Sequence, residues 1–376
     1  MKTKVINFFE DSRFGGPHQY MYSIAKNNDD FLEFDFLISS KDLENFSFKL
    51  NSSNLNYTHI NINRLQKGFL NLFKYTIFFI PDVFKISMHL KKNPYDYIYI
   101  CGGSWQIKGV LAGLISKTEV VWHLNDTYVP WLIRLVFSQL SRLVRFYIFA
   151  SEKTFIYYKP VIKNLQDFEI ISSPIDINYF VPNSNDSEVK KNFYVVNVSN
   201  INPVKGLEEF ILTAEKFNND KPMVKFLNVG QVFSSQEKYF KSLNDLINKL
   251  KIKNLEFLGF SDNVKKILQD SDLYFCTSRK ESSPISVWEA MAMKKPVISF
   301  KVGDVPKYVK DDVNGFIVDN HTEAEKKIRF FLKNREKVKE FGNESRKTII
   351  NNFKEEECFK KHKIFFSRNA SSLEDN

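Results

Sequence analysis

One segment of the chain has an order of apolar and polar stretches that occurs in few folds. Residues 272–300 read DLYFCTSRKESSPISVWEAMAMKKPVISF: a short apolar run, a polar loop, a helical pattern and a second apolar run. This order is typical of a parallel sheet whose strands are joined by crossover helices. In such a sheet the turn from strand to helix lies at the carboxyl edge, where ligands bind. The segment therefore predicts an α/β fold and the place of a binding site.

Two carboxylates bracket this turn. Glu281 and Glu289 have seven residues between them, and Ser282, Ser283 and Pro284 fill the start of the interval. The first turn of a helix offers free N–H groups and partial positive charge to an anion such as a pyrophosphate. The carboxylates on either side could then hold the hydroxyls of a ribose and of a sugar. The structural alternative is a plain N-cap beside two solvated glutamates.

The length of 376 residues predicts two domains rather than one core. Apolar runs alternate with helical patterns before and after a stretch of proline and small polar residues, which predicts two Rossmann-like domains with parallel sheets and a cleft between them. The expected boundaries are 1–172 for the first domain, 173–192 for a linker and 193–350 for the second domain.

Composition excludes several classes of function. The net charge is +10, but the lysines are scattered and no nucleic-acid motif is present, so no nucleic-acid partner is expected. Cys101, Cys276 and Cys358 lie far apart, which indicates neither a metal site nor a disulfide framework and favours a reducing cytoplasm. The first residues do not read as a signal peptide, and no segment has the roughly 20 clean apolar residues that span a bilayer.

The second half of the chain resembles the family 4 retaining glycosyltransferases, which have the GT-B fold. The likeness runs from about residue 193 to about residue 320, through VVNVSNINPVKGLEEFI and then through the segment from LEFLGF to GFIVD. It departs from the family pattern at four positions: Asn200 stands where arginine is usual, Ser282 and Asp304 stand where glycine is common, and Lys307 stands where glutamate often occurs. The likeness also implies that residues 351–376 form a helix that returns to the first domain, and a tail.

The resemblance assigns roles to residues of the second domain. Lys205 would neutralise charge on the leaving diphosphate, and Glu281 would contact the hydroxyls of the donor sugar. Glu289 would hold the ribose, and the backbone N–H groups from Ser283 to Ile285 would face the pyrophosphate. The remaining donor-binding candidates are Ser282, Pro284, Asn200, Gly206 and Phe260.

The resemblance also points to residues of the first domain. His123 ends an apolar run and would face the donor sugar or the acceptor. Gly15 and Gly16 would let the backbone approach the ligand closely. Each has a structural alternative, which is a core histidine for His123 and a simple turn for the glycine pair.

The resemblance implies a retaining, metal-independent hexosyl- or N-acetylhexosaminyl-transferase. Its donor would be a nucleoside-diphosphate sugar of UDP or GDP type, with no further cofactor, and its acceptor a glycan or lipid-linked glycan of bacterial surface polysaccharide synthesis. The Asp-x-Asp pattern at residues 270–272 is interpreted as a structural turn rather than a metal site. A catalytically weak sugar-nucleotide-binding partner of the same fold is an alternative. A dinucleotide-dependent oxidoreductase is another, although a G-x-G-x-x-G sequence is missing.

A helix predicted over residues 130–147 leaves two interpretations open. It would place Arg134, Ser138, Ser141, Arg142 and Arg145 on one side, with Leu132, Leu135, Val136, Leu143 and Phe146 on the other. Such a helix could lie on an anionic membrane, together with the aromatic segment 69–84. It could equally pack its apolar side on the sheet and leave its polar side in solvent. The first interpretation predicts a peripheral protein at the inner face of the cell membrane.

Overall fold

The computed structural model describes residues 2–10, 15–40, 46–65, 68–183, 191–220 and 223–370. The chain forms two compact units, one made of Met1–Pro174 with Glu355–Asn376 and the other of Ile175–Lys354. Of the predicted linker, Ser173 and Pro174 belong to the first unit and the residues from Ile175 onward to the second. In the second unit the Arg346 guanidinium donates a hydrogen bond of 2.7 Å to the carbonyl of Phe180. Residues 184–190 of that linker lie outside the described residues.

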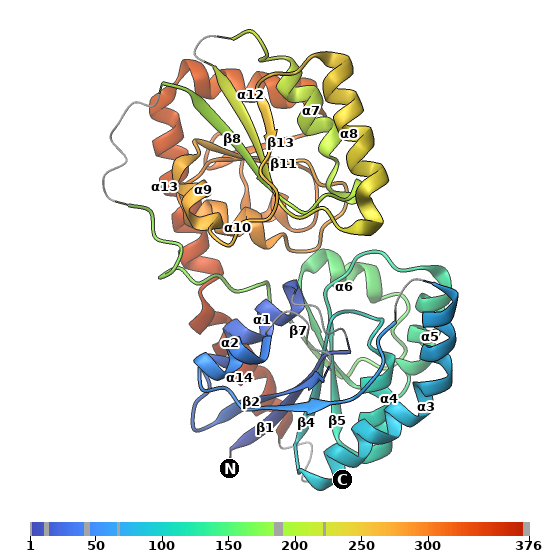
Figure 1. Cartoon of the computed structure of the whole chain (residues 1–376). Helices are drawn as coiled ribbons and strands as arrows, with labels where there is room; N and C mark the ends of the chain where they lie inside the picture. Colours follow the sequence, from blue (N-terminus) through green and yellow to red (C-terminus); the bar gives the residue numbers. More distant parts are fainter. Residues whose placement is uncertain are drawn as a thin grey trace. The chain divides into compact units, whose positions relative to one another are not determined.

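The first unit is built on a seven-stranded parallel sheet in the order β3-β2-β1-β4-β5-β6-β7 (Figure 1). Its strands are β1 (Thr3–Phe8), β2 (Leu32–Ser39), β3 (Tyr57–Ile60), β4 (Tyr97–Cys101), β5 (Glu119–Leu124), β6 (Phe146–Phe149) and β7 (Asp167–Ile170). Both faces of this sheet are covered by helices, as parallel sheets require.

Two hydrophobic clusters fill the two sides of this sheet. One cluster joins it to α1 (Gly16–Ala25), α2 (Phe46–Ser52) and α14 (Glu355–Ala370). The other joins it to α3 (Phe69–Lys92), α4 (Ile107–Ser116), α5 (Trp131–Leu140) and α6 (Glu152–Tyr158). The last helix thus completes the core of the first unit: the Phe366 ring lies 4.9 Å from that of Tyr97 between centroids, and both side chains are buried.

The second unit has a six-stranded parallel sheet in the order β10-β9-β8-β11-β12-β13. Its strands are β8 (Phe193–Val198), β9 (Val224–Val229), β10 (Leu255–Phe257), β11 (Leu273–Cys276), β12 (Val297–Phe300) and β13 (Gly315–Val318). Its α-helices are α7 (Leu207–Glu215), α8 (Glu237–Leu250), α9 (Val264–Asp270), α10 (Ile285–Ala292), α11 (Val305–Tyr308), α12 (His321–Lys333) and α13 (Arg335–Asn352). The expected α/β class with two parallel sheets is confirmed.

The helix predicted over residues 130–147 is wrong in length, and the interpretation that leaves its serines in solvent is wrong as well. Helix α5 ends at Leu140, and the aromatic run at Phe146–Phe149 is the buried strand β6. Ser138 and Ser141 point inward, and both hydroxyls donate to the carbonyl of Val161. Leu132 and Leu135, which the second interpretation packs on the sheet, are instead exposed. Phe137 supplies the apolar contact with the sheet side of the helix.

Among the described residues, the helices lack the combination of length and apolar content that crossing a bilayer requires.

Candidate active site

The β11–α10 loop lies at the carboxyl edge of the second sheet, as the sequence predicted. Strand β11 is buried between β8 and β12, and residues 277–284 lead from it into α10. Pro284 occupies the N-cap position with extended dihedral angles, and no side chain caps the helix. Ser283 does not act as a cap, because its hydroxyl accepts a hydrogen bond of 3.0 Å from the indole of Trp288. The start of α10 therefore keeps the partial positive charge of its first N–H groups.

Lys205 and Glu281 form an ion pair between two loops of this edge. The Nζ atom of Lys205 lies 2.6 Å from Oε1 of Glu281, and both side chains are partly buried. Burial disfavours the ammonium form, but the charge of Glu281 and its hydrogen bond outweigh this effect, so the pKa of Lys205 is raised above its ordinary value. The pair keeps a permanent cation beside the β11–α10 loop.

Backbone contacts fix the two loops against each other. The N–H of Arg279 donates to the carbonyl of Val204 at 2.7 Å, and the hydroxyl of Thr277 donates to the carbonyl of Lys205 at 2.9 Å. Gly206 has a φ of +60°, and a β-carbon there would lie 2.3 Å from the carbonyl oxygen of Thr277. Only glycine tolerates both the positive φ and the close approach of the Thr277 carbonyl oxygen, so the backbone itself requires glycine after Lys205.

Glu289 has a different environment from Glu281. It lies in the second turn of α10, and its carboxyl group makes no hydrogen bond or ion pair with the residues that the structure describes. Burial raises the pKa of Glu289 to about 7. A partly enclosed carboxyl group without a partner is costly to retain, so it marks a place where ligand hydroxyls could bind.

A second loop holds Ser282 in position. The N–H of Asp304 donates to the carbonyl of Ser282 at 3.0 Å, and a β-carbon at Gly303 would lie 2.2 Å from the same oxygen. Ser282 and Asp304 are both buried. Asp304 has a φ of −87°, which any residue adopts, so aspartate at this glycine position causes no backbone strain.

Asn200 follows β8 and Phe260 follows β10, two strands of the same sheet that have β9 between them. The Asn200 side chain accepts a hydrogen bond of 2.8 Å from the N–H of Gln231, so it connects the loops after β8 and β9. Phe260 is 73% exposed and follows Gly259, which has a φ of +73°. Arg279, which lies within the β11–α10 loop, pairs with Glu208 at 3.0 Å.

In the first unit, His123 is buried near the end of β5. Its Nδ1 atom lies 3.1 Å from Sγ of Cys101, and its ring packs against Tyr20 with centroids 4.6 Å apart. Burial, with a smaller effect from His362, lowers the pKa of His123 to about 3. Its Nε2 atom has no hydrogen-bond partner among the described residues. The imidazole is therefore neutral, and its Nε2 atom is buried.

Gly15 and Gly16 do not have the conformation that requires glycine. Gly15 is extended, with a φ of −159°, and Gly16 begins α1. The glycine pair with positive φ follows β4 instead, at Gly102 (+128°) and Gly103 (+86°), where the N–H of Gly103 donates to the carbonyl of His123. The sequence signal for this pair was the CGGS run directly after a buried strand.

The Asp-x-Asp residues have structural partners. Asp272 accepts a hydrogen bond from the N–H of Tyr194, Asp270 pairs with Lys266, and Ser271 donates to the carbonyl of Leu268. Among the described residues, no group of three or more His, Cys, Asp and Glu side chains is arranged to hold a metal ion.

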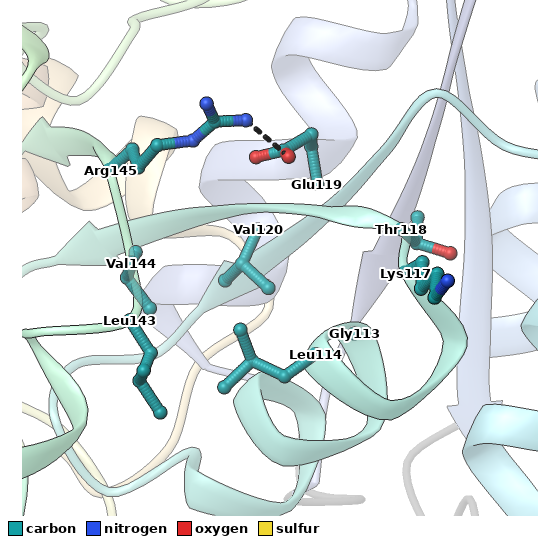
Figure 2. A pocket seen from close by; sticks show the side chains of 9 residues that line it. All are labelled: Gly113, Leu114, Lys117, Thr118, Glu119, Val120, Leu143, Val144 and Arg145. Carbon is teal, nitrogen blue, oxygen red and sulfur yellow. Dashed lines mark hydrogen bonds and ion pairs between the residues drawn. The ribbon is translucent and has the colours of Figure 1, made fainter. Parts of the chain in front are cut away.

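Figure 2 shows a cavity of about 200 Å³ in the first unit. It lies where β5 begins and just before β6, and Arg145 and Glu119 form an ion pair in its lining. His123 lies near the other end of β5, at the carboxyl edge. The cavity is therefore separate from the candidate site. Its lining residues are Gly113, Leu114, Lys117, Thr118, Glu119, Val120, Leu143, Val144 and Arg145.

Residues 183–348 match the family model described as "Glycosyl transferases group 1". This range contains Lys205, Glu281 and Glu289. The chain is 31% identical over 174 residues to the poly(ribitol-phosphate) alpha-N-acetylglucosaminyltransferase of Staphylococcus aureus (strain COL), a match that covers 44% of this chain and 34% of that protein. It is 27% identical over 176 residues to the N-acetyl-alpha-D-glucosaminyl L-malate synthase of Bacillus anthracis, covering 46% and 44% of the two chains. The match thus spans less than half the length of either relative.

The whole chain resembles solved structures in fold. The crystal structure of Anabaena Alr3699/HepE in complex with UDP and glucose superimposes with a TM-score of 0.82 over 97% of this chain and 99% of that one, at 21% sequence identity. At this identity the likeness concerns the fold, and the chain has the GT-B fold with two Rossmann-like units.

Proposed function

We propose that this chain, whose residues 183–348 match the group 1 glycosyltransferase model, transfers a sugar from a nucleoside-diphosphate sugar to a glycan or lipid-linked acceptor with retention of anomeric configuration. One observation carries the proposal: the Lys205–Glu281 ion pair and the unpartnered Glu289 carboxyl group border the uncapped start of α10. The cation and the helix start suit the diphosphate of a sugar nucleotide, and the two carboxyl groups suit the hydroxyls of its ribose and its sugar.

Each group has a distinct task in this proposal. The diphosphate lies against the N–H groups at the start of α10, where the helix dipole favours negative charge. Lys205 stabilises the charge that grows on the diphosphate as its bond to the sugar breaks. Glu289 accepts hydrogen bonds from the ribose diol, and Glu281 contacts sugar hydroxyls while it holds Lys205 in place.

The transfer itself needs no protein nucleophile. The acceptor oxygen bonds to the sugar carbon on the face that the diphosphate leaves, while positive charge spreads over the sugar ring. The protein contributes positioning and electrostatic stabilisation. In the first unit, a sugar or acceptor hydroxyl would satisfy the Nε2 atom of His123, which has no partner among the described residues.

A thermal-shift panel of nucleoside diphosphates and sugar nucleotides tests donor binding. A donor present at about 100 times its Kd stabilises the folded protein by about 2.7 kcal/mol, so the compounds of one base should raise Tm above the others. NMR of freshly formed product then reports the anomeric configuration, and a chelator should leave the rate unchanged. An inverted product or equal shifts for all bases would contradict the proposal.

A second candidate is a sugar-nucleotide-binding partner with weak catalysis. Asn200 favours this candidate, because it stands where the family 4 pattern usually has arginine. Its side-chain carbonyl oxygen already accepts a hydrogen bond from the N–H of Gln231. Donor hydrolysis distinguishes the two candidates. A protein that binds the donor tightly but neither hydrolyses nor transfers it would be the binding partner.

A further inference from the structure

Helix α3 presents an apolar stripe to solvent. Six side chains spaced three or four residues apart along its outer side are between 52% and 71% exposed: Leu70, Phe73, Ile77, Ile80, Phe84 and Met88. The opposite side of the helix packs on the sheet through buried Val83, Ile86 and Leu90. A surface helix of a globular protein normally turns polar residues outward, so α3 has two apolar sides rather than one.

Helix α5 repeats this feature. Trp131 is 77% exposed, and Leu132 and Leu135 are also exposed, while Ser138 is buried and bonded to the carbonyl of Val161. Tyr128 before the helix and Leu143 after it are exposed as well. The helix thus buries Ser138 together with Phe137 and leaves Trp131, Leu132 and Leu135 outward, which costs free energy unless something covers them.

The two stripes lie on the same side of the first sheet. Helices α3 and α5 both pack on the cluster that contains Val83, Ile86 and Phe137, so their outer sides point away from the same face of the sheet (Figure 1). We call this surface, made by the exposed side chains of α3 and α5 named above, the α3–α5 face.

Basic residues outnumber acids in the two segments that carry the α3–α5 face, although Arg145 is paired with Glu119. Residues 61–92 contain six lysines and arginines and one acid, Asp82, which is buried 3.0 Å from the ammonium of Lys108. Residues 127–151 contain three arginines and no acid. Lys74, Lys85 and Arg142 are exposed. Two copies joined through this face would bring cations together, whereas an anionic surface would pair with them.

We propose that the α3–α5 face docks on an anionic lipid bilayer, with its apolar side chains in the interfacial region and its basic side chains at the lipid headgroups. Helix α3 would lie in the plane of the membrane, because an apolar stripe between basic side chains is the arrangement of interfacial helices. This surface is independent of the proposed donor site, so lipid binding is measured without a donor.

Vesicle flotation of the full chain tests the proposal. Vesicles of phosphatidylcholine alone are compared with vesicles containing about one-third phosphatidylglycerol, at about 0.1 M and about 0.5 M salt. The test variant is F73S/I77S/I80S, which removes three members of the α3 stripe. The control variant is F48S/I364S, because Phe48 on α2 and Ile364 on α14 are exposed on helices that cover the other face of the same sheet. Thermal melts check that both variants are folded.

The unmodified chain and the control should float with the anionic vesicles at low salt, and the test variant should lose about tenfold or more in partitioning. Tryptophan emission should shift to the blue on binding, and Trp131→Phe should remove most of the shift. Of the other three tryptophans, Trp122 and Trp288 are buried, and Trp105 lies in the loop between β4 and α4, outside the α3–α5 face. Absence of binding, or equal loss in test and control variants, would overturn the proposal. A dimer in light scattering that the test variant dissociates would instead assign the face to a second copy.

Discussion

The ammonium of Lys205 and the carboxylate of Glu281 are 76 residues apart in sequence and 2.6 Å apart in space. Each is held by its own loop, and the loops are joined by the hydrogen bond from Arg279 N–H to the carbonyl of Val204. The pair is therefore part of a rigid carboxyl edge rather than a chance contact of two long side chains.

Removing either partner should disable transfer. We expect Lys205→Ala and Glu281→Ala each to lower kcat by about 100-fold or more, because both act on charge that develops as the sugar–diphosphate bond breaks. The double variant should be no worse than the poorer single variant, since the residues act as a unit. Lys266→Ala, which breaks the exposed pair with Asp270, is the control and should leave kcat unchanged. Normal turnover in either site variant would remove that residue from the proposed set.

Donor binding should depend on the ionisation of Glu289. Its pKa is raised to about 7, and the ionised form is the better acceptor for two hydroxyls, so donor affinity should rise as pH increases through about 7. In Glu289→Gln this dependence should disappear. Titration calorimetry with a donor at several pH values measures the effect, and an unchanged pH profile in the variant would contradict it.

The same group should lower stability at high pH. The unfolded carboxyl group ionises near pH 4.5, whereas the folded one stays protonated up to about pH 7. Stability is therefore lost as pH rises between these values, and the loss persists above them. Glu289→Gln should raise Tm at pH 8 more than at pH 5.5. A Tm gain that is larger at the lower pH would show that the carboxyl group is not destabilised by burial.

Two glycines with positive φ allow a matched comparison. Gly206→Ala should destabilise the protein by more than about 2 kcal/mol, since the new β-carbon meets the Thr277 carbonyl oxygen at 2.3 Å. Gly259→Ala has a similar φ but no atom within 4 Å of the new carbon, so it should cost only about 1 kcal/mol. Urea unfolding of both variants measures the difference in their free energies of unfolding. Equal losses in the two variants would show that the loops of Gly206 and Thr277 can move apart.

His123 should remain neutral down to about pH 4. Because its pKa is lowered to about 3, its ring nitrogens should keep the NMR shifts of a neutral imidazole down to about pH 4. The chain has six histidines, so the signal is assigned by its loss in His123→Gln. A titration midpoint near 6.5 would show that the ring is solvated and that the buried geometry around Cys101 is wrong.

The sequence predicts the β11–α10 region well because its signals are local. The apolar run, the polar loop and the helical pattern that define it all fall within residues 272–300. The ion pair between Lys205 and Glu281 could not be predicted from local sequence. It depends on the sheet order that brings β8 next to β11, and this order is set by the whole unit.

The orientation of α5 was not predictable from periodicity. The pattern shows that one side is apolar, but it does not say that Ser138 finds a buried acceptor at Val161 while Leu132 and Leu135 remain outside. Similarly, the Gly15–Gly16 pair and the Gly102–Gly103 pair look alike in sequence. Only the dihedral angles, set by the contact of Gly103 with the end of β5, separate them.

Helix α14 has a consequence for the order in which the chain acquires its structure during synthesis. The first unit uses Cys358, Phe359, Phe365 and Phe366 to close its core, whereas the second unit is one continuous segment, Ile175–Lys354. The ribosome therefore synthesises the whole second unit, Ile175–Lys354, before it synthesises helix α14 of the first unit. The first unit thus has one side of its sheet covered by α1 and α2 alone until translation has passed residue 366.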